Sequence, residues 1–242
     1  EILSFFKREL KGKNIKTEAI DKIDISLELS EEELKAYVSG APKDDRTKTI
    51  QDSFVELASP PAIETVEELD LYRKKVLSFL KEKTFNAFPK KPVPLDIRLD
   101  FKSLDKQDYS FVSEEGWRLK ISVQTVQNDK DKPLLLVLKN PNEARYESAS
   151  LAGDLREEMT IAYFEARGIG DTGWSSSEQW HIRRAAAWTG RTIASMRVYD
   201  VLRCLEALRT IPGVNSENIS ILAQGEMAAI APYAALLDGN VK

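Results

Sequence analysis

The order of apolar and polar residues changes along this chain, from spacings typical of helices to spacings typical of strands. The first eleven residues place Ile2, Phe6 and Leu10 on one helical face, and Gly12 follows them as a C-cap. The next segment, 13–64, shows no sustained period. We therefore expect a short N-terminal helix, followed by a linker or a segment that wraps around a domain.

Two capping boxes mark the starts of helices further along the chain. Ser30 precedes Glu33 by three residues, which predicts a short helix inside the linker, and Thr65 precedes Glu68 in the same way. The apolar residues after Thr65 recur at helical spacing, at Val66, Leu69, Tyr72, Val76 and Leu80. The second helix is therefore predicted to be amphipathic.

From about residue 96 the apolar period becomes two. The segments 109–111 and 117–123 alternate on either side of Glu114-Glu115-Gly116, which predicts an antiparallel hairpin. Three later runs are apolar throughout, as in strands buried on both faces: 133–138, 160–164 and 219–222.

Helical spacing returns between the last two of these runs. Ile193, Met196, Val201, Leu205 and Leu208 share one side, which predicts a single long helix over about 181–209. A hairpin followed by strands that alternate with helices predicts an α/β fold, with a mostly parallel sheet.

Composition and charge narrow the function classes. Lys plus Arg number 35 and Asp plus Glu 39, a net charge of −4, which gives no reason to expect nucleic acid as a partner. Cys204 is the single cysteine, so an internal disulfide is excluded, and His181 is the single histidine. We expect no metal and no cofactor. An apolar run of about 18 residues is missing, so we expect no membrane span.

The stretch 219–229 carries the candidate chemistry. A strand-like run leads into Ala223-Gln224-Gly225-Glu226-Met227, and a helical run follows it. This is the strand–turn–helix layout of a nucleophile elbow, in which a strained turn presents a serine. The nucleophile position is occupied by Gly225, so the layout is present without its nucleophile.

Three motifs resemble the bacterial acetyl xylan esterase-like α/β-hydrolases. Glu165-Ala-Arg-Gly-Ile-Gly-Asp-Thr172 is similar to the Arg-Gly turn of that family, Arg197–Leu208 to the helix before the elbow, and Asn218–Asp238 to the elbow itself. The resemblance covers residues 95–242. It implies an α/β-hydrolase fold and the cleavage of an acyl ester from a carbohydrate. It also implies export from the cell, whereas the compartment cannot be read from the residues.

The sequence departs from the family at the catalytic positions. The elbow serine is Gly225, and the loop after the first buried strand reads Lys139-Asn140-Pro141-Asn142 in place of the family's His-Gly. That loop normally supplies an oxyanion-hole amide, and Pro141 has no amide hydrogen. The resemblance places the acid and the histidine of the triad on strands beyond Lys242, so the chain is expected to hold the first half of the domain.

The resemblance also implies a domain organisation. The first residues are similar to the closing helix of such a hydrolase, so we expect residues 1–12 to end a preceding domain. Residues 13–64 would then link it to the N-terminal part of a second hydrolase-like domain, 65–242. The rest of the same polypeptide is the expected partner on both sides.

Other residues could replace the missing serine, and each also has a structural interpretation. Glu226 is a candidate acid or base, but a glutamate in the first helical turn more often complements the helix dipole. Ser220 lies within a strand. Ser175, Ser176 and Ser177 lie near His181, although the segment is more simply interpreted as a polar loop.

The stretch after the second buried run contains candidate binding residues. Trp174, Trp180 and Trp188 are candidates for stacking on a sugar, with cover of the core edge as the alternative. Arg167 and Asp171, with Gly168 and Gly170, are expected to hold the turn after the strand rather than a ligand. Asp200 and Arg203 are expected to be helix-surface partners or anchors of a neighbouring loop.

Two function hypotheses follow. In the first, the chain is part of a carbohydrate-ester hydrolase and is itself catalytically inactive. In the second, it is a non-catalytic structural or carbohydrate-binding module that supports a neighbouring hydrolase domain.

Overall fold

The computed structural model describes residues 2–12, 29–55, 59–124, 132–141, 143 and 152–242. The chain divides into two compact units, Glu1–Ala62 and Ile63–Lys242. Each unit is described by itself below.

The N-terminal unit contains short helices. The helix α1 spans Ile2–Lys11 and ends at Gly12, whose φ is +61° and whose amide donates to the Arg8 carbonyl at 2.9 Å. The helix α2 spans Glu31–Leu34 and starts at the predicted Ser30–Glu33 capping box. A 3₁₀ turn, η3, covers Ile50–Ser53. Both predicted helices are confirmed, while the parts of the linker at 13–28 and 56–58 lie outside the described residues.

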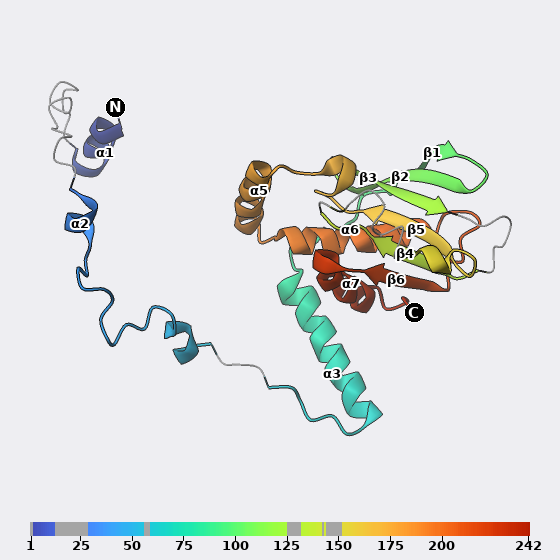
Figure 1. Cartoon of the computed structure of the whole chain (residues 1–242), viewed down its shortest axis with the longest axis horizontal. Coiled ribbons are helices and arrows are strands. Elements are labelled where there is room, and N and C mark those ends of the chain that lie inside the picture. Colours follow the sequence, from blue (N-terminus) through green and yellow to red (C-terminus); the bar gives the residue numbers. More distant parts are fainter. Residues whose placement is uncertain (1, 13–28, 56–58, 125–131, 142, 144–151) are drawn as a thin grey trace. The chain divides into compact units, whose positions relative to one another are not determined.

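The second unit is built on a six-stranded sheet (Figure 1). In chain order the strands are β1 Arg98–Lys102, β2 Lys106–Glu114, β3 Trp117–Gln124, β4 Leu134–Leu138, β5 Thr160–Glu165 and β6 Ile219–Ala223. Their order across the sheet is β1-β2-β3-β5-β4-β6, and β5, β4 and β6 pair in parallel. The pairings of β1 with β2, β2 with β3 and β3 with β5 are antiparallel, so β2, β4, β5 and β6 run in one direction. The predicted α/β class and N-terminal hairpin are confirmed.

The pattern of apolar residues explains how deeply the residues of the central strands are buried. All five residues of β4 are buried, as its continuous apolar run predicts. The β2–β3 hairpin alternates, and the pair Phe111 and Leu119 faces the core. Gly116 closes the hairpin with a φ of +78°. The residues of β1 alternate, with Leu99 and Phe101 as the apolar ones, as the period of two from residue 96 predicts, yet all five are exposed at the edge of the sheet.

The helices of this unit are α3 Val66–Phe79, α5 Ser176–Trp188, α6 Ile193–Leu208 and α7 Gly225–Asp238. The helix α3 continues as a π-helical turn, η4, over Leu80–Thr84, and its Thr65–Glu68 capping box is confirmed. The short 3₁₀ turns η5 and η6 cover Gly153–Leu155 and Gly170–Thr172.

The prediction of one long helix over 181–209 is wrong, because the chain forms two helices there. The helix α5 ends before Gly190, which has a φ of +71°, and α6 begins at the Thr192–Ser195 capping box. The prediction of a polar loop at Ser175–Ser177 is also wrong. Ser175 is the N-cap of α5 and forms a capping box with Glu178, so its hydroxyl is used in starting the helix.

The core lies mainly on one face of the sheet. Apolar residues of α6 and α7 pack there against Leu134, Leu136 and Leu138 of β4 (Figure 1). Arg209 joins these two helices through two hydrogen bonds to Asp238, of 2.6 and 2.7 Å. A smaller apolar cluster covers the other face, around Leu135 and Val137. This packing fixes the carboxyl ends of β4, β5 and β6, where the candidate site lies.

Candidate functional site

The predicted elbow is present at the end of β6. Gln224 is extended, with φ −133° and ψ 170°, and Gly225 follows with a φ of +56° as the first residue of α7. This left-handed conformation is costly for a residue with a Cβ atom and is freely available to glycine. The turn therefore has the form that presents a nucleophile, while its apex carries no side chain.

The side chain of Asn140 lies over this apex. A Cβ atom added to Gly225 would lie 3.1 Å from Asn140 Oδ1 and 3.4 Å from its Cγ and Nδ2. The same Oδ1 accepts a hydrogen bond of 3.2 Å from the amide of Met227, in the first turn of α7. The amide of Asn140 donates to Glu143 Oε2 at 2.8 Å. Asn140 therefore fills the space above the apex and is tied to the first turn of α7.

Glu226 is held by an ion pair. Its Oε1 lies 2.5 Å from Nη1 of Arg197, a residue of α6 whose side chain is buried. The Nε of Arg197 donates to the Arg167 carbonyl at 3.2 Å. Burial lowers the pKa of the Arg197 guanidinium, and the carboxylate of Glu226 opposes this shift. The candidate acid or base is thus paired with a cation that joins the elbow to the turn after β5.

A cavity of about 240 Å³ lies beside the elbow, at the ends of β4 and β5. Its walls include Lys139, Asn140, Glu165, Trp174, Gln179 and Arg197. The ammonium group of Lys139 lies 2.5 Å from the carboxylate of Glu165, so two charges of the wall neutralise each other. The cavity therefore offers paired polar groups and one aromatic side chain.

The three candidate tryptophans do not form one surface. Trp174 lines the cavity and contacts Trp117 edge-to-face, at 6.2 Å between ring centroids. Trp180 and Trp188 lie on α5 outside the cavity lining, and Trp188 is 90% exposed. The alternative interpretation is that these tryptophans cover the edge of the core. It does not hold for Trp188, because that side chain is almost fully exposed. Trp174 is thus the candidate that the structure places at the site.

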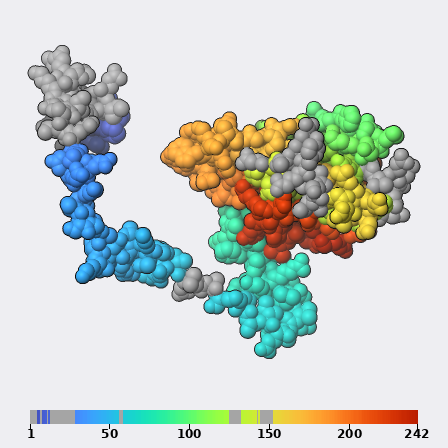
Figure 2. Space-filling model, in the orientation of Figure 1, coloured from blue at the N-terminus to red at the C-terminus, as the bar shows by residue number. Residues whose placement is uncertain are grey.

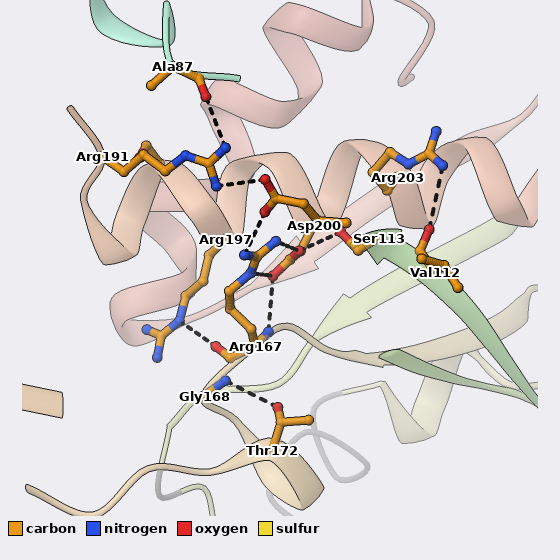
Figure 3. Close-up of polar contacts among 12 residues, drawn as sticks. Ala87, Val112, Ser113, Arg167, Gly168, Thr172, Arg191, Arg197, Asp200 and Arg203 are labelled. Carbon is orange, nitrogen blue, oxygen red and sulfur yellow. Dashed lines mark hydrogen bonds and ion pairs between the residues drawn. The ribbon is translucent and has the colours of Figure 1, made fainter. Parts of the chain in front are cut away.

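A buried ion pair holds the turn after β5 (Figure 3). Arg167 donates to both carboxylate oxygens of Asp200, from Nε at 2.8 Å and from Nη2 at 2.6 Å. The amide of Arg167 and the hydroxyl of Ser113 also donate to this carboxylate, at 3.1 and 2.6 Å. Asp200 is fully buried, so of its two predicted roles, helix-surface partner or anchor of a neighbouring loop, the anchor is the one found. Its carboxylate accepts four hydrogen bonds, which compensates for its burial.

Glu114 extends this network to the surface. Its carboxylate contacts Arg167 at 2.9 Å and Arg191 at 2.7 Å. Burial acts to raise the pKa of Glu114, but the two guanidinium groups outweigh it and the pKa is lowered. Burial likewise acts to lower the pKa of Arg167, and its hydrogen bonds to Asp200 and Glu114 reverse the shift. Both groups therefore stay charged across the neutral range.

The remaining residues of the turn have other partners. Asp171 pairs with Lys120 at 2.6 Å, and this hydrogen bond lowers the pKa of Asp171. Gly168 and Gly170 have φ values of +74° and +57°, and the Gly168 amide donates to Thr172 Oγ1 at 3.1 Å. Arg203 donates to the Val93 carbonyl at 2.5 Å and so anchors the extended segment before β1.

The other candidate catalytic residues lie on α5 and β6. His181 lies on α5 against Trp180, and no hydrogen bond between it and a serine is present in the described part of the chain. Ser220 lies within β6. Groups of three or more His, Cys, Asp or Glu that could bind a metal are absent from the described residues. In the same residues, every helix is too short or too polar to span a membrane.

Sequence reasoning missed the role of Asn140. The signal that could have indicated it was the replacement of the expected His-Gly by Lys139-Asn140, next to a glycine apex. Asn142 lies outside the described residues. The contact itself joins residues 87 positions apart, so it required the structure.

Comparison with known proteins shows the fold. No family model and no curated protein matches the chain. A protein described as an acetyl xylan esterase from Bacteroides fragilis is similar in structure, with a TM-score of 0.58, 12% identity and coverage of 72% of this chain. A glucuronoyl esterase from Solibacter usitatus has a TM-score of 0.57 and 10% identity, and the match covers 78% of this chain. A methylesterase has a TM-score of 0.52 and 14% identity, and the match covers 74% of this chain.

The chain spans 52%, 63% and 41% of the lengths of these three structures. At these identities the similarity shows the fold alone, which is that of the α/β-hydrolases. The fold class implied by the sequence motifs is therefore confirmed, with carbohydrate esterases among its structural neighbours.

Proposed function

We propose that residues 63–242 form a catalytically inactive module of a carbohydrate-ester hydrolase. One observation carries the proposal: Asn140 fills the space above Gly225, where a nucleophile would stand, and accepts the Met227 hydrogen bond. The esterase neighbours and the cavity beside the elbow support the hydrolase class. The missing serine and the side chain that fills the space above the apex support the loss of activity in this segment.

The magnitude of these losses decides against residual catalysis. Loss of a catalytic serine or of an oxyanion donor lowers the rate by factors on the order of 10²–10⁶ each. Pro141 offers no amide hydrogen, and the single histidine, His181, lies on α5 outside the cavity lining. The longer polypeptide is the proposed source of activity, on an acyl ester of a carbohydrate.

We expect the 242-residue chain to show no hydrolysis of an aryl acetate and no covalent labelling by a serine-directed phosphonate. The variant Gly225→Ser should remain inactive, because its side chain would meet Asn140 and lack a histidine partner. Intact-mass spectrometry after phosphonate treatment measures this directly. The matched comparison is the longer polypeptide, which should release acetate from an acetylated sugar. Labelling of the unmodified chain at one serine, abolished by mutating that serine, would contradict inactivity.

A carbohydrate-binding role is the second candidate, and the position of Trp174 favours it. An aromatic ring beside Gln179 and the Lys139–Glu165 pair provides a stacking surface and hydrogen-bonding groups. Titration calorimetry with a xylo-oligosaccharide should detect binding that Trp174→Ala weakens at least about tenfold. Trp188→Ala is the matched control, because Trp188 is exposed outside the cavity lining. Equal losses in both variants, or no binding by the wild type, would exclude this role for the cavity.

A further inference from the structure

The helix α3 exposes its apolar side. None of its fourteen residues is buried, and Val66, Leu69 and Tyr72 are 71%, 50% and 41% exposed. Only its C-terminal end reaches the core, through the partly buried Val76. Figure 2 shows α3, in teal, projecting from the body of the sheet unit. An isolated helix of this length is marginal in water, because most helical stability comes from packing of the apolar face.

The charges of this segment are divided between its two halves. Residues 64–70 contain four acidic side chains and no basic one, Glu64, Glu67, Glu68 and Asp70. Residues 73–83 contain five basic side chains and one acidic one. The helix dipole favours such signs at the ends of a helix. The helix dipole does not explain why the apolar stripe formed by Val66, Leu69 and Tyr72 is exposed.

Two of the four acidic residues are complementary to basic residues about one midpoint. If two copies of α3 run antiparallel with the two-fold axis between Leu71 and Tyr72, Asp70 faces Arg73 of the second copy, and Glu68 faces Lys75 of the second copy. Glu68 and Asp70 flank Leu69 on opposite sides, so both edges of the apolar stripe receive opposite charges.

We propose that α3 pairs antiparallel with α3 of a second copy of this chain. In this register the apolar stripe of Val66, Leu69 and Tyr72 lies opposite residues 71–77 of the second copy, and the acidic half of each helix lies along the basic half of the other. An isologous interface requires that each contact be repeated with the roles exchanged. Two charge pairs reflect about the axis between Leu71 and Tyr72, which meets this requirement, whereas a partner of unrelated sequence would not need it.

Sedimentation equilibrium of the 242-residue chain tests the apolar contact. We expect a monomer–dimer equilibrium that Leu69→Lys weakens at least about tenfold, since a cation would replace an apolar side chain opposite the basic half of the second copy. The matched control is Leu71→Lys, the same substitution on the opposite side of the same helix, where Leu71 is 67% exposed. It should leave the dimer intact. A monomer up to about 1 mM, or equal losses in both variants, would overturn the proposal.

Charge reversal tests the antiparallel register. Asp70→Arg should weaken the dimer, because it brings two cations together, and so should Arg73→Asp, which brings two anions together. The double variant Asp70→Arg/Arg73→Asp restores opposite charges and should recover the wild-type dissociation constant. Circular dichroism of each variant shows whether the helix is retained. A double variant that keeps its helix but stays as weak as the single variants would overturn the register.

Discussion

Replacement of Asp200 by alanine should lower the free energy of unfolding by about 3–5 kcal/mol, because it leaves the buried Arg167 without its main counter-charge. The side chains of this pair are 0% and 2% exposed, and two hydrogen bonds join them directly. The variant also deprives the Arg167 amide and the Ser113 hydroxyl of their acceptor. Urea unfolding at neutral pH measures the change.

The matched control for this prediction is Asp171→Ala, in the same turn. Asp171 and Lys120 form an ion pair of 2.6 Å, but their side chains are 68% and 61% exposed. Exposed pairs contribute about 0–1 kcal/mol, so this variant should unfold almost as the wild type does. If the two variants lost similar free energy, the buried pair would not be what holds the turn after β5.

Gly168→Ala should lower the free energy of unfolding by about 2–4 kcal/mol, through two effects that add. The φ of +74° is unfavourable for alanine, and the new methyl group would lie 2.5 Å from the Trp174 ring. Because that ring lines the cavity, tryptophan fluorescence should change together with stability. Thermal or urea unfolding followed by fluorescence measures both.

Gly213→Ala separates these two effects. Gly213 has a φ of +87°, but no atom lies within 4 Å of an added Cβ, so only the backbone term of about 1–2 kcal/mol is expected. The difference between the two variants is then the cost of displacing Trp174. Equal losses would mean that Trp174 moves away freely and does not form a fixed wall of the cavity.

The elbow illustrates how far a local pattern can predict a site. An apolar run followed by small residues and a helical run predicts the strand, the turn and the helix, because each depends mainly on neighbours in the sequence. Gly225 at the apex also shows, from the sequence alone, that no nucleophile is attached there. What covers the apex was not predictable, since Asn140 comes from a different strand end, 87 residues away from Met227.

The turn after β5 also has one part that the local sequence predicts and one part that only the structure shows. Its glycines predict a tight turn, and both adopt positive φ, but the acid that neutralises Arg167 was not predictable. Asp200 reaches Arg167 because α6 packs across the sheet, which brings together residues 33 positions apart. The spacing of charges along α6 could not distinguish this buried acid from a surface one.

The sequence by itself determined the class of the fold, the hairpin, the buried strands, four capping-box or turn positions at Ser30, Thr65, Gly116 and Gly225, and the absence of the elbow serine. These features depend on periodicity and on local backbone preference, which short stretches of residues carry within themselves. Only the tertiary structure decided which tryptophan lines the cavity, which acid neutralises Arg167 and which side chain closes the elbow. Such contacts depend on how helices and strands pack, and small rotations of an element change the partner of every side chain on it.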